Sequence, residues 1–328
     1  MRAGGEAAPV APAARSRREG YGIEWIAKRQ FGRRRTGVIA ATVGRMAPTL
    51  AGTGIWSGEL RFHDDPGEIA DAAAELESLG YSAVWVPDTG GDLFGALDRL
   101  LAATSTMTVA SGILNIWRHD AGDSARWWAA LADDRRHRTM VGLGVSHSPL
   151  IGEDWGRPLA VMTEYLDRLD AGHLPVERRC VAALGPKMLE LARERSAGAH
   201  PYLVTPEHTA TARRVLGGAL LAVEQGVVLE ADPDRARAVA RQAVDHYCAL
   251  PNYVNNWKRL GFTQDDVDHR SDRLIDALFA WGDLGAIEAR IDAHRAAGAD
   301  HVCVQVLNER GASLNRAAWR ELAQALIP

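Results

Sequence analysis

Two strand–loop–helix units follow each other between Cys180 and Thr211. In the first, the apolar run Cys180–Leu184 is interrupted by Gly-Pro and followed by a helical pattern from Lys187. In the second, we expect a strand over 200–204, followed by Thr-Pro, residues preferred at a helix cap and first turn. Strands that alternate with helices across short loops run parallel, in a sheet covered by helices. The pattern predicts the α/β class.

The same alternation extends over most of the 328 residues. Strands are expected to start near residues 53, 82, 107, 139, 180, 199, 219 and 299. Eight strand–helix units predict a (β/α)8 TIM barrel, with a helical insertion between strands 7 and 8. We expect the seventh strand at 219–223, with a separate extended piece at 227–230. A doubly wound open sheet would show G-x-G-x-x-G after its first strand, and that fingerprint is not found there.

Residues 1–51 differ from the rest of the chain, because they are rich in Ala, Pro, Gly and Arg and lack long apolar periodicity. We predict a disordered N-terminal extension over 1–51 and one barrel domain over 52–328. The alternative is a basic arm or an export signal, since Arg33–Arg35 precede a mildly apolar run. That run is too short to span a membrane.

Composition narrows the classes of partner. The net charge of -4 and the pI near 6.3 give no reason to expect nucleic acid or a membrane as a partner. Cys180, Cys248 and Cys303 are far apart in the sequence and form no CxxC pair. We therefore predict reduced thiols, a cytoplasmic protein and no metal site.

The loops after the strands carry the chemistry in a barrel of this kind. Asp88 and His147 stand there. Residues 185–188 are a candidate phosphate cradle at a helix N-terminus, with an ordinary turn as the alternative.

Two tryptophans are further candidates for the site, whereas two further histidines are expected to lie outside it. Trp56 and Trp117, at strand ends, are expected to wall a substrate pocket for a planar group. We expect His200 to be buried and structural, and His208 to be exposed or to cap a helix. The Arg-rich helix at 234–241 is expected to be a solvated face.

Six segments at strand ends match motifs of one known family. They are 80–87, 112–115, 142–147, 183–189, 198–209 and 298–302. The most specific are GLGVSH, ALGPKML and GAHPYLVTPEHT, which resemble motifs of the bacterial-luciferase-like oxidoreductases. More narrowly, they resemble the branch that uses the deazaflavin coenzyme F420. The resemblance covers residues 52–328, in order.

The resemblance implies where a cofactor would bind. A flavin-like ring would lie across the barrel mouth, with its phosphate against the loops after strands 5 and 6. A bulge with a non-proline cis peptide at Gly112-Ile113 would back the ring, and Asp88 and Thr89 match the positions that meet it. The implied cofactor-binding residues are Thr89, Gly112, Ile113, Asn115, Ser146, Gly185, Pro186, Lys187, Met188 and Thr205.

The resemblance also implies an activity. The ring of F420 would exchange a hydride with a small organic substrate, and His147 or Asp88 would handle the proton. His147 matches a position that holds an acid or base in some F420 dehydrogenases, and histidine titrates near neutral pH. For His147, a purely structural hydrogen bond is the open alternative. FMN is the alternative cofactor, in a luciferase-like monooxygenase that uses O2 and a partner reductase. A catalytically inactive barrel that acts as a binding protein is the alternative from a different class. The family resemblance further implies a homodimer.

Overall fold

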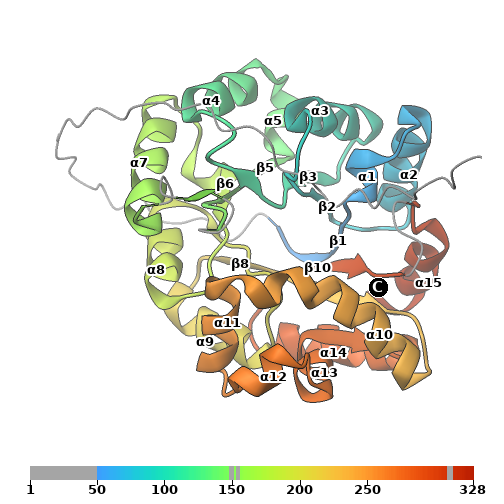
Figure 1. Cartoon of the computed structure of the whole chain (residues 1–328). Coiled ribbons are helices and arrows are strands. Elements are labelled where there is room, and N and C mark those ends of the chain that lie inside the picture. The colour runs from blue at the N-terminus through green and yellow to red at the C-terminus, as the bar shows by residue number, and fades with distance from the viewer. Residues whose placement is uncertain (1–49, 148–150, 153–155, 309–312) are drawn as a thin grey trace, which may run out of the picture. The chain divides into compact units, whose positions relative to one another are not determined.

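The computed structural model describes residues 50–147, 151–152, 156–308 and 313–328. Contacts divide the chain into two units, and the described residues lie in the unit Val43–Pro328. Eight parallel strands of this unit close into a barrel surrounded by helices, which confirms the predicted TIM barrel (Figure 1). Except for Leu50 and Ala51, the predicted extension lies outside the described residues.

The barrel closes because its last strand pairs with its first strand on one edge and with its seventh strand on the other. The strands are β1 (Gly52–Trp56), β2 (Ala83–Val86), β3 (Thr108–Ser111) with β4 (Leu114–Asn115), β5 (Thr139–Gly144), β6 (Arg179–Val181), β7 (Gly198–Ala199), β8 (Leu220–Val228) and β10 (His301–Val306). β3 and β4 both pair with β5 and form two parts of one barrel strand. His301 of β10 pairs with Gly52 on one side and Ala222 on the other, and this closes the barrel.

Helices follow the strands as the sequence predicts. They are α1 (Glu59–Phe62), α2 (Pro66–Ser78), α3 (Leu93–Ala103), α4 (Ala121–Ala130), α5 (Asp133–His137), α7 (Pro158–Ala171), α8 (Pro186–Arg195), α9 (Pro206–Leu216), α14 (Leu284–Ala296) and α15 (Arg316–Leu326). The expected caps form: Asp65 Oδ1 accepts from Gly67 N, and Thr205 Oγ1 accepts from His208 N. These caps satisfy amides that have no partner inside a helix.

The predicted insertion between strands 7 and 8 is present, but it also contains a strand. Its elements are α10 (Pro233–Val244), the 3-10 helix η3 (Asp245–Ala249), α11 (Pro251–Arg259), α12 (Gln264–Asp268), α13 (Asp272–Leu278) and β9 (Phe279–Trp281). The short strand β9, which the sequence did not predict, pairs with the end of β8. The insertion has its own hydrophobic core, which includes Trp257 and Phe279 and contacts Tyr202 and Leu307 from barrel loops. It therefore packs on the carboxyl ends of the strands, the end called the barrel mouth below.

The predicted strand over 200–204 is wrong. Strand β7 is limited to Gly198 and Ala199, and the next five residues are irregular, with Leu203 at φ 53°. The ring of His200 turns inward and stacks on Trp85 at 4.2 Å, and Leu203 N donates to the Glu224 carboxylate. These tertiary contacts override the local β preference of the apolar run.

The two extended pieces expected at 219–223 and 227–230 form one continuous strand, β8. Glu224 and Gln225, which lie between the two expected pieces, are buried and paired with β10. Gln225 is held by the side chain of His294, at 2.9 Å, and by Leu278 O. Burial by the insertion therefore keeps a polar segment inside the strand.

The barrel interior is filled by side chains. Its cluster contains Leu50, Ala83, Trp85, Ala110, Met140, Cys180, Leu220, Ala222 and Cys303. Trp85 Nε1 donates to His301 Nε2 at 3.1 Å. Burial lowers the pKa of His301 to about 3, so this imidazole is neutral and accepts the bond. The packed interior forms a floor below the mouth.

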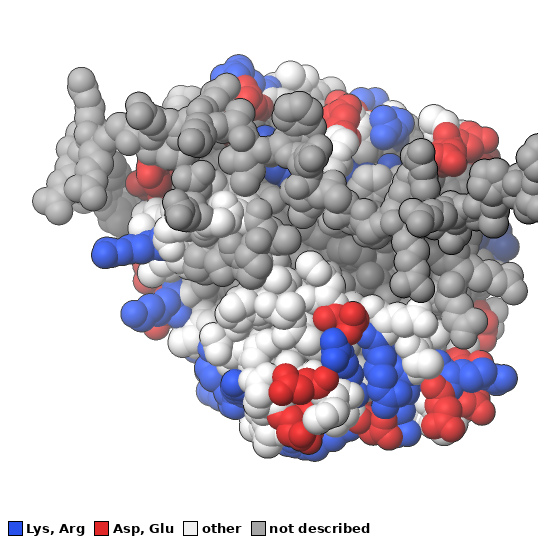
Figure 2. All heavy atoms as spheres, in the orientation of Figure 1, with Lys and Arg blue, Asp and Glu red and all other residues white. Residues whose placement is uncertain are grey.

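The surface of the insertion carries paired charges. Arg237 of α10 lies 2.6 Å from Asp276, and Arg241 pairs with Asp272. Figure 2 shows basic and acidic atoms side by side over this part of the molecule. The arginine-rich helix is thus neutralised by its neighbours, as expected of a solvated face. Among the described residues, no helix is both long and apolar enough to cross a membrane.

The buried Arg138 gives a test of the barrel's amino-terminal end. Its guanidinium donates to Thr104 Oγ1 and to the carbonyl oxygens of Leu101, Thr104 and Met107. Arg138→Gln would leave several of these acceptors unpaired, which costs roughly 2–4 kcal/mol. We expect the thermal midpoint to fall by about 5–10 °C. The control Arg126→Gln, at a side chain that is 74% exposed, should leave it within about 1 °C; equal midpoints would contradict the assignment.

Candidate active site at the barrel mouth

The predicted site residues lie in the loops that form the barrel mouth. One group lies around the ends of β1 to β4. There, Asn115 N donates to Asp88 Oδ2, and Trp56 Nε1 donates to Gly112 O. His147, after β5, is bonded to the insertion instead. The structure therefore brings the predicted residues to one end of the barrel.

The bulge at the end of the third barrel strand has the predicted form. The peptide between Gly112 and Ile113 is cis. A Cβ atom on Gly112 would lie 2.8 Å from Trp56 Nε1, and one on Gly144 would overlap Ile113 Cδ1. Glycine at these two positions lets Trp56 and Ile113 lie directly against the backbone. Trp117 Nε1 donates to Val145 O at 2.8 Å, which fixes the next aromatic ring beside β5.

Asp88 lies at the centre of a cationic cluster. Its side chain is fully buried, and its Oδ1 lies 3.5 Å from Arg61 Nη2 and 3.4 Å from Arg118 Nε. His119 Nε2 lies 3.0 Å from Asp88 Oδ2. The cluster ties together the loops after β1, β2 and β4. Thr89, the neighbouring predicted residue, is exposed.

His147 is half-buried and oriented by the insertion. Its Nδ1 lies 3.0 Å from Asn252 Oδ1, and its ring lies 5.5 Å from that of Tyr253. Burial lowers the pKa of His147, although the Asn252 hydrogen bond opposes this effect. The ring is therefore neutral at pH 7. Because an amide oxygen only accepts, Nδ1 must donate, and Nε2 keeps a lone pair that can take a proton.

The opposite side of the mouth holds residues that the sequence analysis missed. Tyr202 lies 5.7 Å from the Trp56 ring and donates its hydroxyl to Gln305 Oε1 at 2.8 Å. Tyr247 and Tyr253 of the insertion contact Tyr202. Tyr202 belongs to the motif 198–209, but Tyr247 and Tyr253 lie in the insertion, outside the recognised motifs, so no local pattern connects the three residues.

Glu224 is a second missed residue. It is 1% exposed, its Oε2 accepts from Leu203 N at 3.2 Å, and its Oε1 is buried without a hydrogen-bond partner. Burial raises the pKa of this carboxyl to about 8. A glutamate between the apolar residues of a predicted barrel strand is the signal that could have identified it, because acidic side chains are rarely fully buried unless they are paired.

The candidate phosphate cradle is open. Gly185 caps α8 without a side-chain hydrogen bond, and Pro186 and Lys187 are exposed while Met188 is half-buried. A Cβ atom on Gly185 would meet only Arg259 Nη2, 3.8 Å away. Arg259 belongs to α11 of the insertion and adds a positive charge that the sequence analysis did not include. The helix N-terminus and this charge both favour an anion.

The neighbouring segment is occupied by structural contacts. Thr205 Oγ1 caps α9, and its side chain is buried. His208 Nε2 lies 2.9 Å from Leu184 O, and His208 is 3% exposed. The expectation of an exposed His208 is wrong, because its ring closes the space between the two loops. His200 and its stack on Trp85 agree with the expected structural role.

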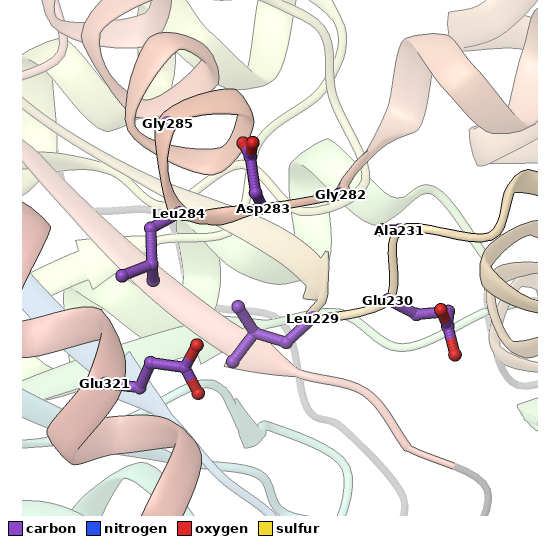
Figure 3. Close-up of a pocket in the computed structure, with 8 residues that line it drawn as sticks. All are labelled: Leu229, Glu230, Ala231, Gly282, Asp283, Leu284, Gly285 and Glu321. Carbon is purple, nitrogen blue, oxygen red and sulfur yellow. The ribbon is translucent and has the colours of Figure 1, made fainter.

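Two further findings delimit the site. Within the described parts of the chain, no group of three or more His, Cys, Asp or Glu side chains is placed to hold a metal ion. Figure 3 shows a surface depression between the loops after β8 and β9, lined by Leu229, Leu284 and Glu321 among others. None of the predicted site residues lines it. Asp283 at its rim caps α14 by accepting from Ala286 N, so its carboxylate has a structural role.

Comparison with known proteins agrees with this geometry. Residues 36–172 match the model of the luciferase-like monooxygenase family. The coenzyme F420-dependent tetrahydromethanopterin reductase of Methanopyrus kandleri has 17% identity and a TM-score of 0.66, covering 85% of this chain and 99% of that one. An F420-dependent secondary alcohol dehydrogenase, in complex with an F420–acetone adduct, has 14% identity and a TM-score of 0.65, with coverages of 85% and 99%.

An FMN protein is also similar. The oxygenating constituent of 3,6-diketocamphane monooxygenase from Pseudomonas putida, in complex with FMN, has 13% identity and a TM-score of 0.59. It covers 85% of this chain and 98% of that one. The chain thus has the luciferase-like oxidoreductase and monooxygenase fold, and the predicted resemblance to the bacterial-luciferase-like oxidoreductases is confirmed. Structural neighbours include both F420-dependent and FMN-dependent proteins.

The raised pKa of Glu224 gives a pH-dependent test. An unfolded glutamate has a pKa near 4.5, and the folded one has a pKa of about 8. Between these values the folded state binds one more proton, so the free energy of unfolding must fall as the pH rises from about 4.5 to 8. Glu224→Gln removes this loss. Its stability relative to wild type, measured by urea unfolding, should improve across that window and level off above it, whereas exposed Glu321→Gln should show no such trend.

Proposed function

We propose that this chain is a coenzyme F420-dependent oxidoreductase that exchanges a hydride with a small organic substrate. The open cradle at Gly185, with Arg259 beside it, carries the proposal. An anion-binding helix terminus at one side of the mouth, together with an aromatic wall and a glycine bulge at the other, suits a planar ring with a phosphate-bearing tail. The two F420-dependent neighbours support the choice of cofactor.

The residues present fit such a cofactor. The phosphate would lie against residues 185–188, where Gly185 leaves open space and Lys187 and Arg259 supply charge. Pro186 has no N–H and shapes the turn, and Met188 and Thr205 border it. The ring would lie against Gly112 and Ile113. Thr89, Asn115 and Ser146 would line its edge, and Trp56 and Trp117 would wall the substrate side.

When bound, F420 supplies a ring carbon that accepts or donates a hydride. The chain's own part is to orient the reactants, exclude water and move the proton. His147 is the proton-transfer residue in this proposal, because Nε2 of the neutral ring is free to accept a proton. Asn252 holds the ring in the required tautomer. Asp88, which is surrounded by Arg61, Arg118 and His119, would position the cofactor edge and support the loop geometry.

FMN remains the alternative cofactor, in a monooxygenase that uses O2 and a partner reductase. The family model and the FMN-bound neighbour favour this second candidate. An inactive barrel with a binding role would bind neither cofactor. A homodimer stays a prediction of the family resemblance, and a cytoplasmic location stays a prediction from the cysteine pattern.

Cofactor binding tests the proposal directly. We expect F420 to quench protein fluorescence saturably and FMN to have no comparable effect. Arg259→Gln should weaken F420 binding by about tenfold, because it removes a charge from the phosphate site. Lys258→Gln is the matched control, since Lys258 is exposed on the same helix. Tight FMN binding without an F420 response would favour the monooxygenase, and binding of neither would contradict both enzymes.

Variants of His147 test the proton-transfer role. His147→Ala should lower the rate of hydride transfer about 100-fold, measured with a substrate found by screening alcohols and carbonyl compounds, while F420 affinity stays within about threefold. In the direction of substrate oxidation, the wild-type rate should fall at a pH below 6.5, because burial lowers the pKa of the accepting imidazole. The control His269→Ala changes an exposed histidine of the insertion. An unchanged pH profile in the His147→Ala protein would contradict the assignment.

A further inference from the structure

Four buried polar atoms without a hydrogen bond gather around Asp88. They are Arg61 Nε, Arg61 Nη1, Asp88 Oδ1 and His119 Nε2, out of twelve such side-chain atoms among the described residues. Native proteins leave few buried polar groups unpaired, because each costs free energy. Asp88 Oδ1 and His119 Nε2 still have ion-pair partners within the cluster. Arg61 Nε and Nη1 have no hydrogen-bond partner among the described residues, and two such N–H groups on a buried guanidinium indicate a site that a bound group completes.

Arg61 points most directly to a ligand. Its side chain is 2% exposed, and its only hydrogen bond to a described residue runs from Nη2 to Gly90 O. Asp88 Oδ1 is 3.5 Å away without the geometry of a hydrogen bond. Burial lowers the pKa of Arg61, yet a guanidinium keeps its charge in proteins. Two of its nitrogen atoms thus lack an acceptor.

The charges around Arg61 do not balance. Arg61, Arg118 and Arg99 contribute three positive charges, and Asp88 and Asp92 contribute two negative ones. Among these five groups, one positive charge remains. Arg118 has a side chain that is 35% exposed, so the cluster reaches solvent on this side. One monoanion would neutralise it and accept from the free N–H groups.

The cluster lies beside the proposed cofactor residues. Asp88 accepts from Asn115 N, which is assigned above to the ring edge, and Thr89 follows Asp88 directly. The phosphate cradle belongs to other loops, after β6 and β7. An anion held here would therefore be separate from the cofactor's phosphate and next to the reacting end of the site.

We propose that Arg61, Arg118 and His119 form an anion subsite of the barrel mouth that binds the carboxylate of the substrate. This inference rests on the proposed function, since it names the substrate class of that same site. A carboxylate carries the single charge that the cluster lacks, and arginine N–H groups suit its planar oxygens. The substrate class is thus a small organic acid.

Binding of acetate by the full-length protein tests the subsite. Acetamide, its neutral isostere, is the control ligand, and saturation-transfer NMR at constant ionic strength is the measurement. We expect acetate to bind and acetamide not to bind. Arg118→Gln should weaken acetate binding at least fivefold, and Asp88→Asn should strengthen it by removing the competing negative charge. Arg126→Gln, an exposed arginine of α4, should change nothing.

Several outcomes would overturn the proposal. Equal binding of acetate and acetamide, or equal acetate affinity of the Arg118→Gln and Arg126→Gln proteins, would show that the cluster is not an anion subsite. Inorganic phosphate that binds tenfold tighter than acetate would exclude a carboxylate site. Arg118 is partly exposed, so its variant should fold, and an unchanged thermal midpoint verifies this.

A titration with F420 separates this inference from the proposed function. Acetate that still binds to the F420-saturated protein supports a substrate subsite. Displacement of acetate by F420 would assign the cluster to the cofactor and overturn the inference. Failure of F420 to bind would contradict the proposed function, while the acetate comparison of the variants would still decide the anion subsite.

Discussion

The pairing of β8 with β10 is the interaction on which the rest of the structure depends. It runs from the pair Ala222–His301 to the pair Val227–Val306 and closes the barrel. Paired residues of these two parallel strands point to the same side of the barrel wall. Glu224 is paired with Cys303, and Gln305 lies two residues further along β10, nearer the mouth. The insertion starts after β8 and returns to it through β9, which pairs with Val227 and its neighbours. Closure of the barrel thereby places the insertion on the mouth.

The insertion then supplies partners that the barrel loops lack. Asn252 orients His147, Arg259 lies beside the Gly185 cradle, and Tyr253 contacts both His147 and Tyr202. These three residues come from one helix, α11, whose buried face packs into the second hydrophobic core. A single helix therefore couples the candidate proton-transfer residue to the candidate phosphate site. A change that shifts α11 should affect both functions together, since rigid elements transmit such displacements.

The sequence predicted the fold where local pattern and tertiary packing agree. Helix α9 begins after Thr205 as predicted, because the Thr-Pro cap is a local feature of the sequence. The error at 200–204 arose because the turn there depends on His200 stacking on Trp85 and on Glu224 binding Leu203 N, contacts between distant residues. The same limit applies to the site. Positions such as Asp88 and His147 follow from the ends of strands, whereas Arg61, Asn252 and Glu224 become partners only through the fold.

The two sides of the mouth differ in electrostatic character, and this difference bears on the chemistry. On the side of β1 to β4, Asp88 lies between the guanidinium groups of Arg61 and Arg118. On the other side, His147 is neutral and the buried Glu224 keeps its proton up to a pH of about 8. The neutral side is therefore suited to proton exchange through His147, and the guanidinium groups on the other side are suited to holding an anion. A substrate that bridges the two would be anchored by its charge and react at its uncharged end.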